Sequence, residues 1–335
     1  MDASDKNTYG AVLHSPYLYI MTLQQFEYIV ALDEEKHFQR AADRCFVTQP
    51  TLSMQVQKLE ELLGVTLFDR KSSPIRATAA GEQVLKHARE ALAAAKQVKT
   101  VARAFGDWKS GEFSLGIIPT MAPYILPRLL PALLGQYPQL RLMVDELETD
   151  QILERLKAQT LDMAILAGPL QQPEIRLEEV FFEPLMVYAA LDHPLAGAGT
   201  ISSDRLDSSG LWLLKKGHCL RIQMLNLCQL QPDQGDRRFI FESGSVETLK
   251  MMVTQNGGYT IVPALAAQNE PEPMGVYVPF TQPQPARSVV VATHHAFPGQ
   301  GFSSALAKTL KSLVPEEFLT RDKYDIIGIQ GSDSQ

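Results

Sequence analysis

The sequence contains few cysteines and no long apolar run. Three cysteines among 335 residues are too few for the disulfide framework of a small secreted protein, and their odd number is typical of a reducing compartment. No segment is apolar over the roughly 20 residues that a membrane-spanning helix needs. The apolar run within residues 1–20 is interrupted by His14, Ser15 and Pro16, which is atypical of a signal peptide. We therefore expect a cytoplasmic protein with no membrane partner, preceded by a disordered extension over residues 1–20.

The chain also lacks an excess of basic residues. Its 31 Lys and Arg are outnumbered by 38 Asp and Glu, which gives a formal net charge of -7. Such a chain does not attract nucleic acid as a whole, although one local surface still can. The length and the 45% hydrophobic content indicate a globular protein of about two domains with a buried core.

Residues 21–80 have the pattern of a DNA-binding head. A helix from Met21 is followed by a short helix, FQRAADRCF, the turn VTQ and a third helix, PTLSMQVQKLEELLG. Two short helices joined by a three-residue turn predict a helix-turn-helix, whose second helix can enter the major groove of double-stranded DNA. A helical corner without any DNA-binding role is the alternative when the helices are considered alone. The spacing predicts apolar faces on the first and third helices: Leu23, Phe26, Ile29 and Val30, then Leu52, Val56, Leu59 and Leu63.

The segment after Gly64 predicts a wing. VTLFDRKSSPIRATAAG contains two short strands with a turn at residues 72–74 between them. Basic side chains on such a wing lie near phosphates and contribute salt-dependent affinity for any DNA sequence. Residues 21–80 hold seven Lys and Arg against eight Asp and Glu, so affinity has to depend on where a few basic groups are placed. The predicted DNA-contacting residues are Gln49, Pro50, Thr51, Ser53, Gln55, Lys58, Arg70, Lys71 and Arg76.

Residues 81–110 predict a linker helix that joins two copies of the chain. The stretch from Ala80 to Phe105 has no proline, and small or apolar residues recur in it at spacings of three and four. An alanine-lined seam permits the close approach of an identical helix, and a two-fold dimer presents two recognition helices about one DNA turn apart. A helix packed on its own domain is the alternative. The seam is predicted from Leu85, Ala88, Leu92, Ala95, Ala102 and Phe105.

Residues 111–315 alternate apolar strands with helices, and residues 316–335 are expected to be a tail. FSLGIIP, YILPRLLPALLGQYP, LRLMVDEL, DQILERLKAQ and DMAILAG follow in β-α-β-α-β order, which predicts a parallel sheet with helices on both faces. LMVYAAL, LWLLK, RFIFES, YTIVPA and RSVVVAT, with the helices VETLKMMVTQ and SSALAKTLKSL, predict a second unit of this type. The predicted fold class is therefore α/β with an all-α head, in which residues 111–315 form two Rossmann-like subdomains.

Two threonines follow strands of the first unit. In such sheets ligands lie beyond the carboxyl ends of the strands, and Thr120 and Thr149 fall at these ends. Each hydroxyl could instead cap the helix that follows it. The sequence therefore marks both residues as candidates for a crevice between the units without deciding between the two roles.

Cys219 and Cys228 lie nine positions apart in the amphipathic stretch GHCLRIQMLNLCQL. Spacing alone favours two inert core thiols over a bridge or a switch. His218 adjoins Cys219, but no CxxC pair and no second histidine at ligand spacing completes the four ligands of a zinc site. We therefore expect neither a metal nor a cofactor, and we expect Cys45 in the head to be a redox-inert core residue.

The order of winged helix-turn-helix, linker helix and two α/β subdomains resembles the LysR-type transcriptional regulators. The stretch AADRCFVTQPTLSMQVQKLEELLGVTLFDR is similar to the head of that family along its length. Further along, GIIPTMAPYILP, SVETLKMMV, TIVPALA and GHCLRIQMLNLC resemble the members of the family that sense hydrogen peroxide. The resemblance covers about residues 21–313. It implies a regulator that is not an enzyme, that binds double-stranded DNA as a homodimer or homotetramer, and that acts with RNA polymerase.

Two other functions remain open at this point. A LysR-type regulator could respond to a small organic effector, with its cysteines incidental. A thiol peroxidase with an attached helical domain would be an enzyme, but turnover requires neither the head nor the linker helix.

The resemblance also implies roles for individual residues. Cys219 matches the peroxide-reactive cysteine and Cys228 its resolving partner, while Thr120, Thr149 and His218 match residues that line the peroxide site. Oxidation would then give a sulfenic acid that condenses to a disulfide. If residues 219–228 are helical, the two Cα atoms lie roughly 13 Å apart, whereas a disulfide tolerates no more than about 7 Å. We therefore expect this segment to unwind when the bond forms.

Basic residues are frequent around Cys219. Because the thiolate is the nucleophile, we expect a cationic environment that favours the anion. The chain departs from the family pattern at Asp150, where a histidine is expected, and at two lysines that replace acidic residues. The basic residues within four positions of the cysteine are Lys215, Lys216, His218 and Arg221.

Overall fold

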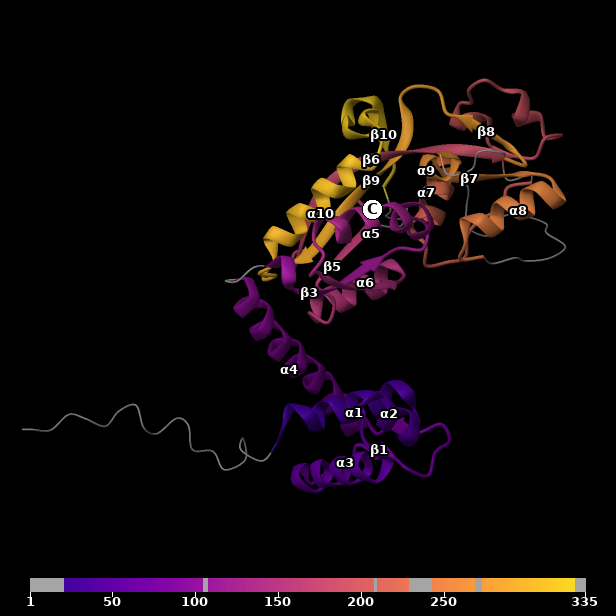
Figure 1. The fold of residues 1–335 in the computed structure, drawn as a ribbon. Coiled ribbons are helices and arrows are strands. Elements are labelled where there is room, and N and C mark those ends of the chain that lie inside the picture. Colours follow the sequence, from indigo (N-terminus) through magenta and orange to yellow (C-terminus); the bar gives the residue numbers. More distant parts are fainter. Residues whose placement is uncertain (1–20, 105–107, 208–209, 229–242, 269–272, 329–335) are drawn as a thin grey trace, which may run out of the picture. The chain divides into compact units, whose positions relative to one another are not determined.

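The computed structural model describes residues 21–104, 108–207, 210–228, 243–268 and 273–328, except for the side chains of residues 96, 97 and 99–104. The chain divides into two compact units, one ending at Lys99 and one beginning at Thr100. Each unit has its own hydrophobic core, and Figure 1 shows the helices and strands of both units. The extension expected over residues 1–20 lies outside the described residues. Within the described ranges, no helix combines the length and apolar character needed to cross a membrane.

The head has the predicted winged helix-turn-helix. The sequence sets its boundaries locally, because Thr22 and Gln25 form a capping box before the first helix and Gly64 ends the third helix with a φ of 69°. The two wing strands pair antiparallel, with Phe68 opposite Ala77. Its elements are α1 (Leu23–Glu35), α2 (Phe38–Arg44), α3 (Gln49–Leu63), β1 (Phe68–Asp69) and β2 (Arg76–Ala77).

The core of the head confirms the predicted apolar faces of α3 and α1, except at Leu23: Ile29 is buried, and Phe26 and Val30 pack against the core. Leu52, Val56 and Leu59 are buried on α3. On α1 the buried side includes Leu32, whereas the predicted Leu23 is 47% exposed. These two leucines are nine residues apart, which is a rotation of about 180° beyond whole turns, so one helix face cannot hold both.

Helix α4 (Ala79–Ala104) begins in the head and forms part of its core. Gly81 allows this close approach, because a Cβ at that position would lie 2.1 Å from the carbonyl oxygen of Leu67. Leu85 and Ala88, predicted for a dimer seam, are buried in the core of their own head. The alternative interpretation therefore holds for Leu85 and Ala88, the first two of the six predicted seam residues, whereas Leu92 and Ala95 are half-buried. Ala102 and Phe105 lie outside the described side chains.

The second unit alternates strands and helices from residue 108 to residue 328. Short 3-10 turns lie at Trp108–Ser110, Pro194–Gly197, Ser203–Arg205, Glu316–Leu319 and Arg321–Lys323. Its longer elements are β3 (Glu112–Ile117), α5 (Ala122–Gln136), β4 (Arg141–Glu146), α6 (Thr149–Lys157), β5 (Met163–Gly168), β6 (Ile175–Ala189), α7 (Cys219–Leu227), α8 (Val246–Asn256), β7 (Tyr259–Pro263), α9 (Ala264–Gln268), β8 (Val276–Pro279), β9 (Gln284–His294), α10 (Gln300–Ser312) and β10 (Tyr324–Ile326).

The sheet is mixed, which corrects the all-parallel prediction. Its strand order is β4-β3-β5-β9-β6-β7, with β8 on β6 and β10 on β9. Strand β3 is parallel to β4 and β5, as predicted, but β9 is antiparallel to both β5 and β6. The reason is topological, because β6 leads from the first subdomain to the second and β9 returns. The predicted strand LWLLK forms only the isolated bridges Leu211 to Tyr259 and Leu214 to Ser243, and residues 238–242 of RFIFES lie outside the described residues.

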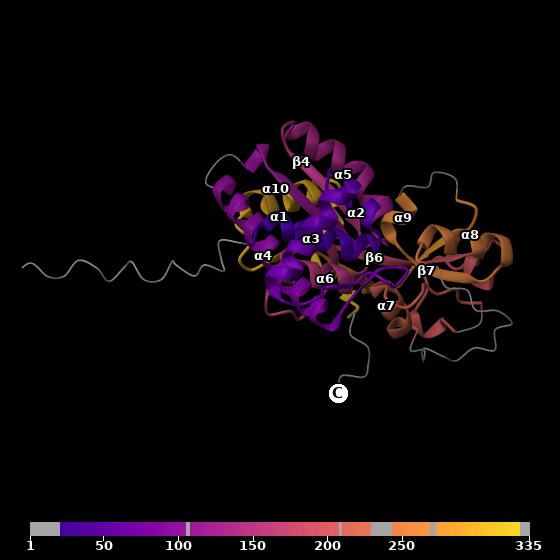
Figure 2. The same cartoon turned by 90° about the horizontal axis from the view of Figure 1, so that it is seen from below.

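Strands β6 and β9 connect two α/β subdomains, as predicted. The first part of β6 pairs with β9 and its last residues pair with β7 and β8. In both views α5, α6 and α10 lie around the first part of β6, and α7, α8 and α9 lie around its end (Figure 1 and Figure 2). Side chains at the middle of these two strands are therefore placed between the subdomains.

Residues 316–328, which were predicted to belong to a tail, are part of the second unit. Phe318 is buried, and β10 pairs parallel with β9 through Tyr324 opposite Gln284. The carbonyl oxygens of Ile327 and Gly328 accept hydrogen bonds from side chains of α7. The described part of this segment thus packs against the helix that carries the two cysteines.

Candidate functional site

Cys219 and Cys228 lie at opposite ends of one helix. Cys219 is the first residue of α7 and Cys228 is its C-cap. Both are free thiols that are 7% exposed. The helical premise of the sequence analysis is thus met, and a helix of this length separates the two Cα atoms by roughly 13 Å. A disulfide is incompatible with this conformation.

Thr149 touches the sulfur of Cys219. Its Oγ1 lies 2.9 Å from the Cys219 Sγ, and both side chains are buried. The N-cap of α6 is Glu148, so Thr149 is the first helical residue and not the cap. Of the two roles that the sequence left open for Thr149, the structure shows a contact with the thiol.

Thr120 is held by a buried arginine that the sequence analysis missed. Arg287 donates to the Thr120 Oγ1 at 2.9 Å and to its carbonyl oxygen at 3.1 Å. The same guanidinium donates from Nε to Glu183 at 2.9 Å, and both charged side chains are 0% exposed. Glu183 also accepts from the backbone amide of Leu265 at 3.1 Å. An arginine and a glutamate within apolar strands were the available signal, since such residues are fully buried only when paired.

The local environment of Cys219 acts on its pKa in both directions. Burial has the largest effect and raises the pKa of the thiol above its ordinary value. The hydrogen bond with Thr149 and the positive charge of Arg287 lower it, and the carboxylate of Asp150 raises it. Burial therefore opposes formation of the Cys219 thiolate, and a hydrogen-bond partner and a nearby cation favour it.

The cationic environment predicted from sequence neighbours is not formed. Lys215 Nζ lies 2.7 Å from Glu148 Oε1, so its charge is paired. Arg221 donates to the carbonyl oxygen of Leu214 at 2.6 Å, and Lys216 is exposed. The positive charge that lowers the pKa of the thiol comes from a strand about 70 residues away in sequence, because adjacent side chains on a turn and helix point in different directions.

His218 presents a buried nitrogen beside the thiol. The residue is 4% exposed, and burial lowers the pKa of its imidazole, which favours the neutral ring. Among the described residues, the buried side-chain N and O atoms without a hydrogen-bond partner are His218 Nε2 and Gln223 Oε1. These residues flank Cys219 in sequence. His218 Nε2 lies near Gly244, and the Gln223 amide nitrogen donates to the Ile327 carbonyl oxygen. Because buried polar atoms are rarely left without a partner, each of the two atoms marks a place where a small polar ligand or a water can bind.

Cys228 has a different environment. Burial and the charge of Asp207 raise the pKa of its thiol to about 12. Its neighbours belong to the main hydrophobic core. In the described parts of the chain no group of three or more His, Cys, Asp or Glu residues is placed to hold a metal ion.

The predicted DNA-contacting residues lie on α3 and the wing, and none is buried. Pro50 lies in the first turn of α3, as its missing amide favours. Arg70 is paired with Glu60 at 2.9 Å and lies over the ring of Phe38, so its charge is partly engaged within the head. The nine residues remain candidates for DNA contact: Gln49, Pro50, Thr51, Ser53, Gln55, Lys58, Arg70, Lys71 and Arg76.

Comparison with known families identifies the class. Residues 23–82 match the bacterial regulatory helix-turn-helix protein of the LysR family, and residues 107–314 match the LysR substrate binding domain. The chain therefore belongs to the LysR family of transcriptional regulators, and its helix-turn-helix binds DNA. It is a regulator and not an enzyme, as predicted.

Several individual proteins and solved structures of this family are similar to the chain. The chain is 38% identical over 293 residues to the hydrogen peroxide-inducible genes activator of Pectobacterium carotovorum, covering 87% of this chain and 96% of that protein. It is similar to a full-length OxyR variant from Pseudomonas aeruginosa, with a TM-score of 0.69, 34% identity and coverage of 87% and 98% of the two chains. A hydrogen peroxide-bound OxyR variant from Corynebacterium glutamicum gives a TM-score of 0.59, 30% identity and coverage of 87% and 92%.

Proposed function

We propose that the protein is a peroxide-responsive transcriptional activator in which Cys219 is oxidised and then joined to Cys228. The observation that carries the proposal is the contact between Cys219 and Thr149, with Arg287 acting on the same thiol and Cys228 at the other end of the same helix. The relatives named for peroxide response support it.

The chemistry balances as a two-electron oxidation. The Cys219 thiolate attacks one peroxide oxygen, the O–O bond breaks, and the leaving hydroxide takes up the proton that the thiol released, giving water and a sulfenic acid. The Cys228 sulfur then attacks the sulfenic sulfur, and the hydroxyl leaves as a second water when the disulfide forms. Hydrogen peroxide is reduced and the two thiols are oxidised.

The buried polar groups have distinct parts in the first step. Thr149 donates its hydroxyl hydrogen to the thiolate, since an anion at that sulfur can only accept. Thr120 accepts from Arg287, so its own hydroxyl hydrogen is free to bind a peroxide oxygen. The neutral imidazole of His218 offers Nε2 to the same ligand, and these groups stabilise the charge that develops on the leaving oxygen.

Closing the disulfide requires α7 to unwind. Leu220, Met224 and Leu227 are buried on this helix, and each is worth roughly 1.5 to 3 kcal/mol of burial. The bonds from Gln223 to Ile327 and from Asn226 to Gly328 would break as well. Re-siting this much buried surface is sufficient to shift an interface between two packings.

The oligomer and the partners are part of the proposal. A homodimer formed through the second half of α4, where Val98 is 71% exposed, would present two recognition helices to double-stranded DNA. Two such dimers would form a homotetramer that contacts RNA polymerase at promoters of antioxidant genes in the cytoplasm. The disulfide would change the distance between the heads.

DNA footprinting with reduced and peroxide-treated full-length protein tests the proposal. We expect the protected region to shift in the wild type and to stay unchanged in Cys228→Ser, because the variant cannot close the disulfide. An identical shift in Cys219→Ser would instead indicate a regulator with a different effector. A wild-type protein with both thiols free after peroxide treatment would refute the redox switch.

A further inference from the structure

We propose that the ion pair between Glu148 and Lys215 positions Thr149 on Cys219 and so sets the rate at which the thiol is oxidised. This inference rests on the proposed function, and it concerns two residues that lie next to the site without touching the sulfur. Glu148 and Lys215 are therefore positioning residues.

The ion pair and the site hydrogen bond join the same two segments. Glu148 directly precedes Thr149 at the start of α6, and Lys215 lies four residues before Cys219 at the start of α7. The distance between Lys215 Nζ and Glu148 Oε1 is 2.7 Å, and that between the Thr149 Oγ1 and the Cys219 Sγ is 2.9 Å. Because α6 and α7 belong to different subdomains, a change in their separation alters both contacts together.

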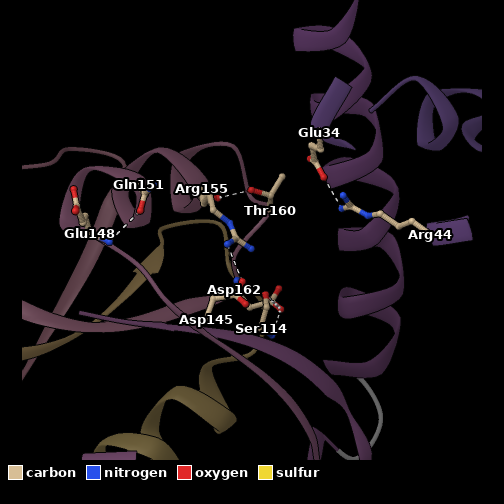
Figure 3. Close-up of polar contacts among 9 residues, drawn as sticks. All are labelled: Glu34, Arg44, Ser114, Asp145, Glu148, Gln151, Arg155, Thr160 and Asp162. Atoms are coloured by element: carbon tan, nitrogen blue, oxygen red, sulfur yellow. Dashed lines mark hydrogen bonds and ion pairs between the residues drawn. The ribbon is translucent and has the colours of Figure 1, made fainter. Parts of the chain in front are cut away.

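The carboxylate of Glu148 is enclosed from two sides. Gly217 has a φ of 95°, and a Cβ at that position would lie 2.7 Å from Glu148 Oε2. The carboxylate therefore packs directly against the backbone of the turn before α7 and contacts Lys215 at the same time. On its own helix, the Glu148 amide donates to the Gln151 Oε1 at 3.1 Å, which fixes the start of α6 (Figure 3).

The pair acts through position and not through its charge. The hydrogen bond from Lys215 lowers the pKa of the Glu148 carboxyl, which favours its ionised form. The charge of Lys215 is offset by the opposite charge of Glu148, so the pair contributes little electric field at the thiol. The cation that lowers the pKa of Cys219 is Arg287. What the pair supplies is a second connection between the starts of α6 and α7, next to the contact between Thr149 and Cys219.

Charge exchange between the two positions is the decisive experiment. In a full-length Cys228→Ser background, the rate constant for sulfenic acid formation is measured with hydrogen peroxide and dimedone trapping. Since partly exposed pairs are individually weak, we expect a drop of about five- to ten-fold in Glu148→Lys and in Lys215→Glu, where like charges face each other. The double exchange restores the pair in reverse and should bring the rate to within about three-fold of the parent. A double variant as slow as the product of the single effects would overturn the proposal.

A second readout separates this inference from the proposed function. Methyl methanethiosulfonate modifies a thiolate without peroxide, and the pH profile of Cys219 modification is recorded for the same variants. Loss in the single variants and recovery in the double variant, with no reaction of any variant with peroxide, would uphold the positioning role and refute peroxide sensing. If peroxide oxidises Cys219 but the double variant does not recover the rate, peroxide sensing is upheld and the positioning role of the ion pair is refuted.

The chain supplies a matched control. Asp145 and Arg155 form an ion pair of 2.8 Å between β4 and α6, with side chains that are 47% and 35% exposed (Figure 3). This pair lies within one subdomain and does not reach α7. Asp145→Asn is therefore expected to leave the oxidation rate of Cys219 unchanged, whereas Glu148→Gln lowers it about two- to five-fold. Equal effects of the two neutral variants would show a general charge effect and contradict positioning.

Discussion

The two ends of α7 carry the same side chain at the same degree of burial but in different chemical environments. At its start, the thiol of Cys219 has a threonine hydroxyl at 2.9 Å and a cation nearby. At its end, the thiol of Cys228 has apolar neighbours and a negative charge at Asp207, and its pKa is raised to about 12. Both cysteines are 7% exposed, so accessibility does not distinguish them. The difference teaches that polar partners brought from the other subdomain, and not exposure, distinguish the two sulfurs.

The largest expected difference between the two ends of α7 is in the rate of thiol oxidation when each cysteine is removed in turn. A pKa of about 12 leaves roughly one thiolate in 100,000 at pH 7, so Cys228 should be nearly inert toward peroxide on its own. We expect Cys219→Ser to slow thiol oxidation at least about a hundred-fold, while Cys228→Ser keeps the rate of the first step and accumulates sulfenic acid. Dimedone trapping followed by peptide mass spectrometry measures both. Rapid modification of Cys228 in Cys219→Ser would break the comparison, and Cys45→Ser serves as the control.

Deleting the Thr149 hydroxyl, which contacts the sulfur at the start of α7, should make the two ends of α7 more alike. Thr149→Val removes the hydrogen bond that lowers the pKa of Cys219, and bonds to charged groups are worth about 1.5 to 3 kcal/mol. We expect peroxide oxidation to slow by about ten-fold or more, measured by stopped-flow mixing near neutral pH. Thr149→Ser keeps the hydroxyl and should recover most of the rate.

A second threonine provides the control for that change. Thr309 is also buried, and its hydroxyl donates to the Ala305 carbonyl oxygen at 2.9 Å within α10. Thr309→Val removes a hydroxyl of similar burial away from both cysteines and should leave the oxidation rate unaltered. If both valine variants slowed the reaction equally, loss of packing and not the contact with sulfur would be the cause.

Local spacing was enough to predict the elements, and it failed where distant segments meet. The wing and α3 follow from patterns within about 15 residues, and both are present. The helix between the two cysteines, which the sequence analysis took only as a condition, is present as well. Arg287 and Glu183 are 104 positions apart, and their contact depends on how β9 returns antiparallel to β6. No periodicity within either strand reports that pairing.

The charges around the thiol show the same limit more sharply. Counting basic residues near Cys219 predicted a cationic site, yet Lys215 is paired with Glu148 and Arg221 is bound to a carbonyl oxygen. Sequence proximity gives the composition of a turn but not the direction of its side chains. The sequence therefore correctly predicted a positive charge near the sulfur, but that charge belongs to Arg287 and not to the basic residues beside Cys219.

The smallest expected effect is on the pH dependence of the free energy of unfolding, to which His218 and Cys228 contribute in different pH ranges. Burial lowers the pKa of His218 below its ordinary value of 6.5, against an opposing effect from Glu148 and together with a smaller one from Lys215. As pH falls below 6.5 the unfolded chain takes up this proton before the folded protein does, so the free energy of unfolding decreases.

At Cys228 the folded pKa is raised, so its contribution to the free energy of unfolding is complete below the ordinary value of 9.0 and is lost as pH rises toward 12. Urea unfolding from pH 8 down to pH 5 should show a loss of stability that is smaller in His218→Gln, and an unchanged acid slope in that variant would assign the loss to other groups. In a second urea series from pH 8 up to pH 11, Cys228→Ser should lose part of the alkaline slope, while its acid slope stays that of the wild type. Cys219, whose pKa is also raised, contributes alkaline sensitivity at the start of α7, so the acid sensitivity of His218 is what distinguishes that end.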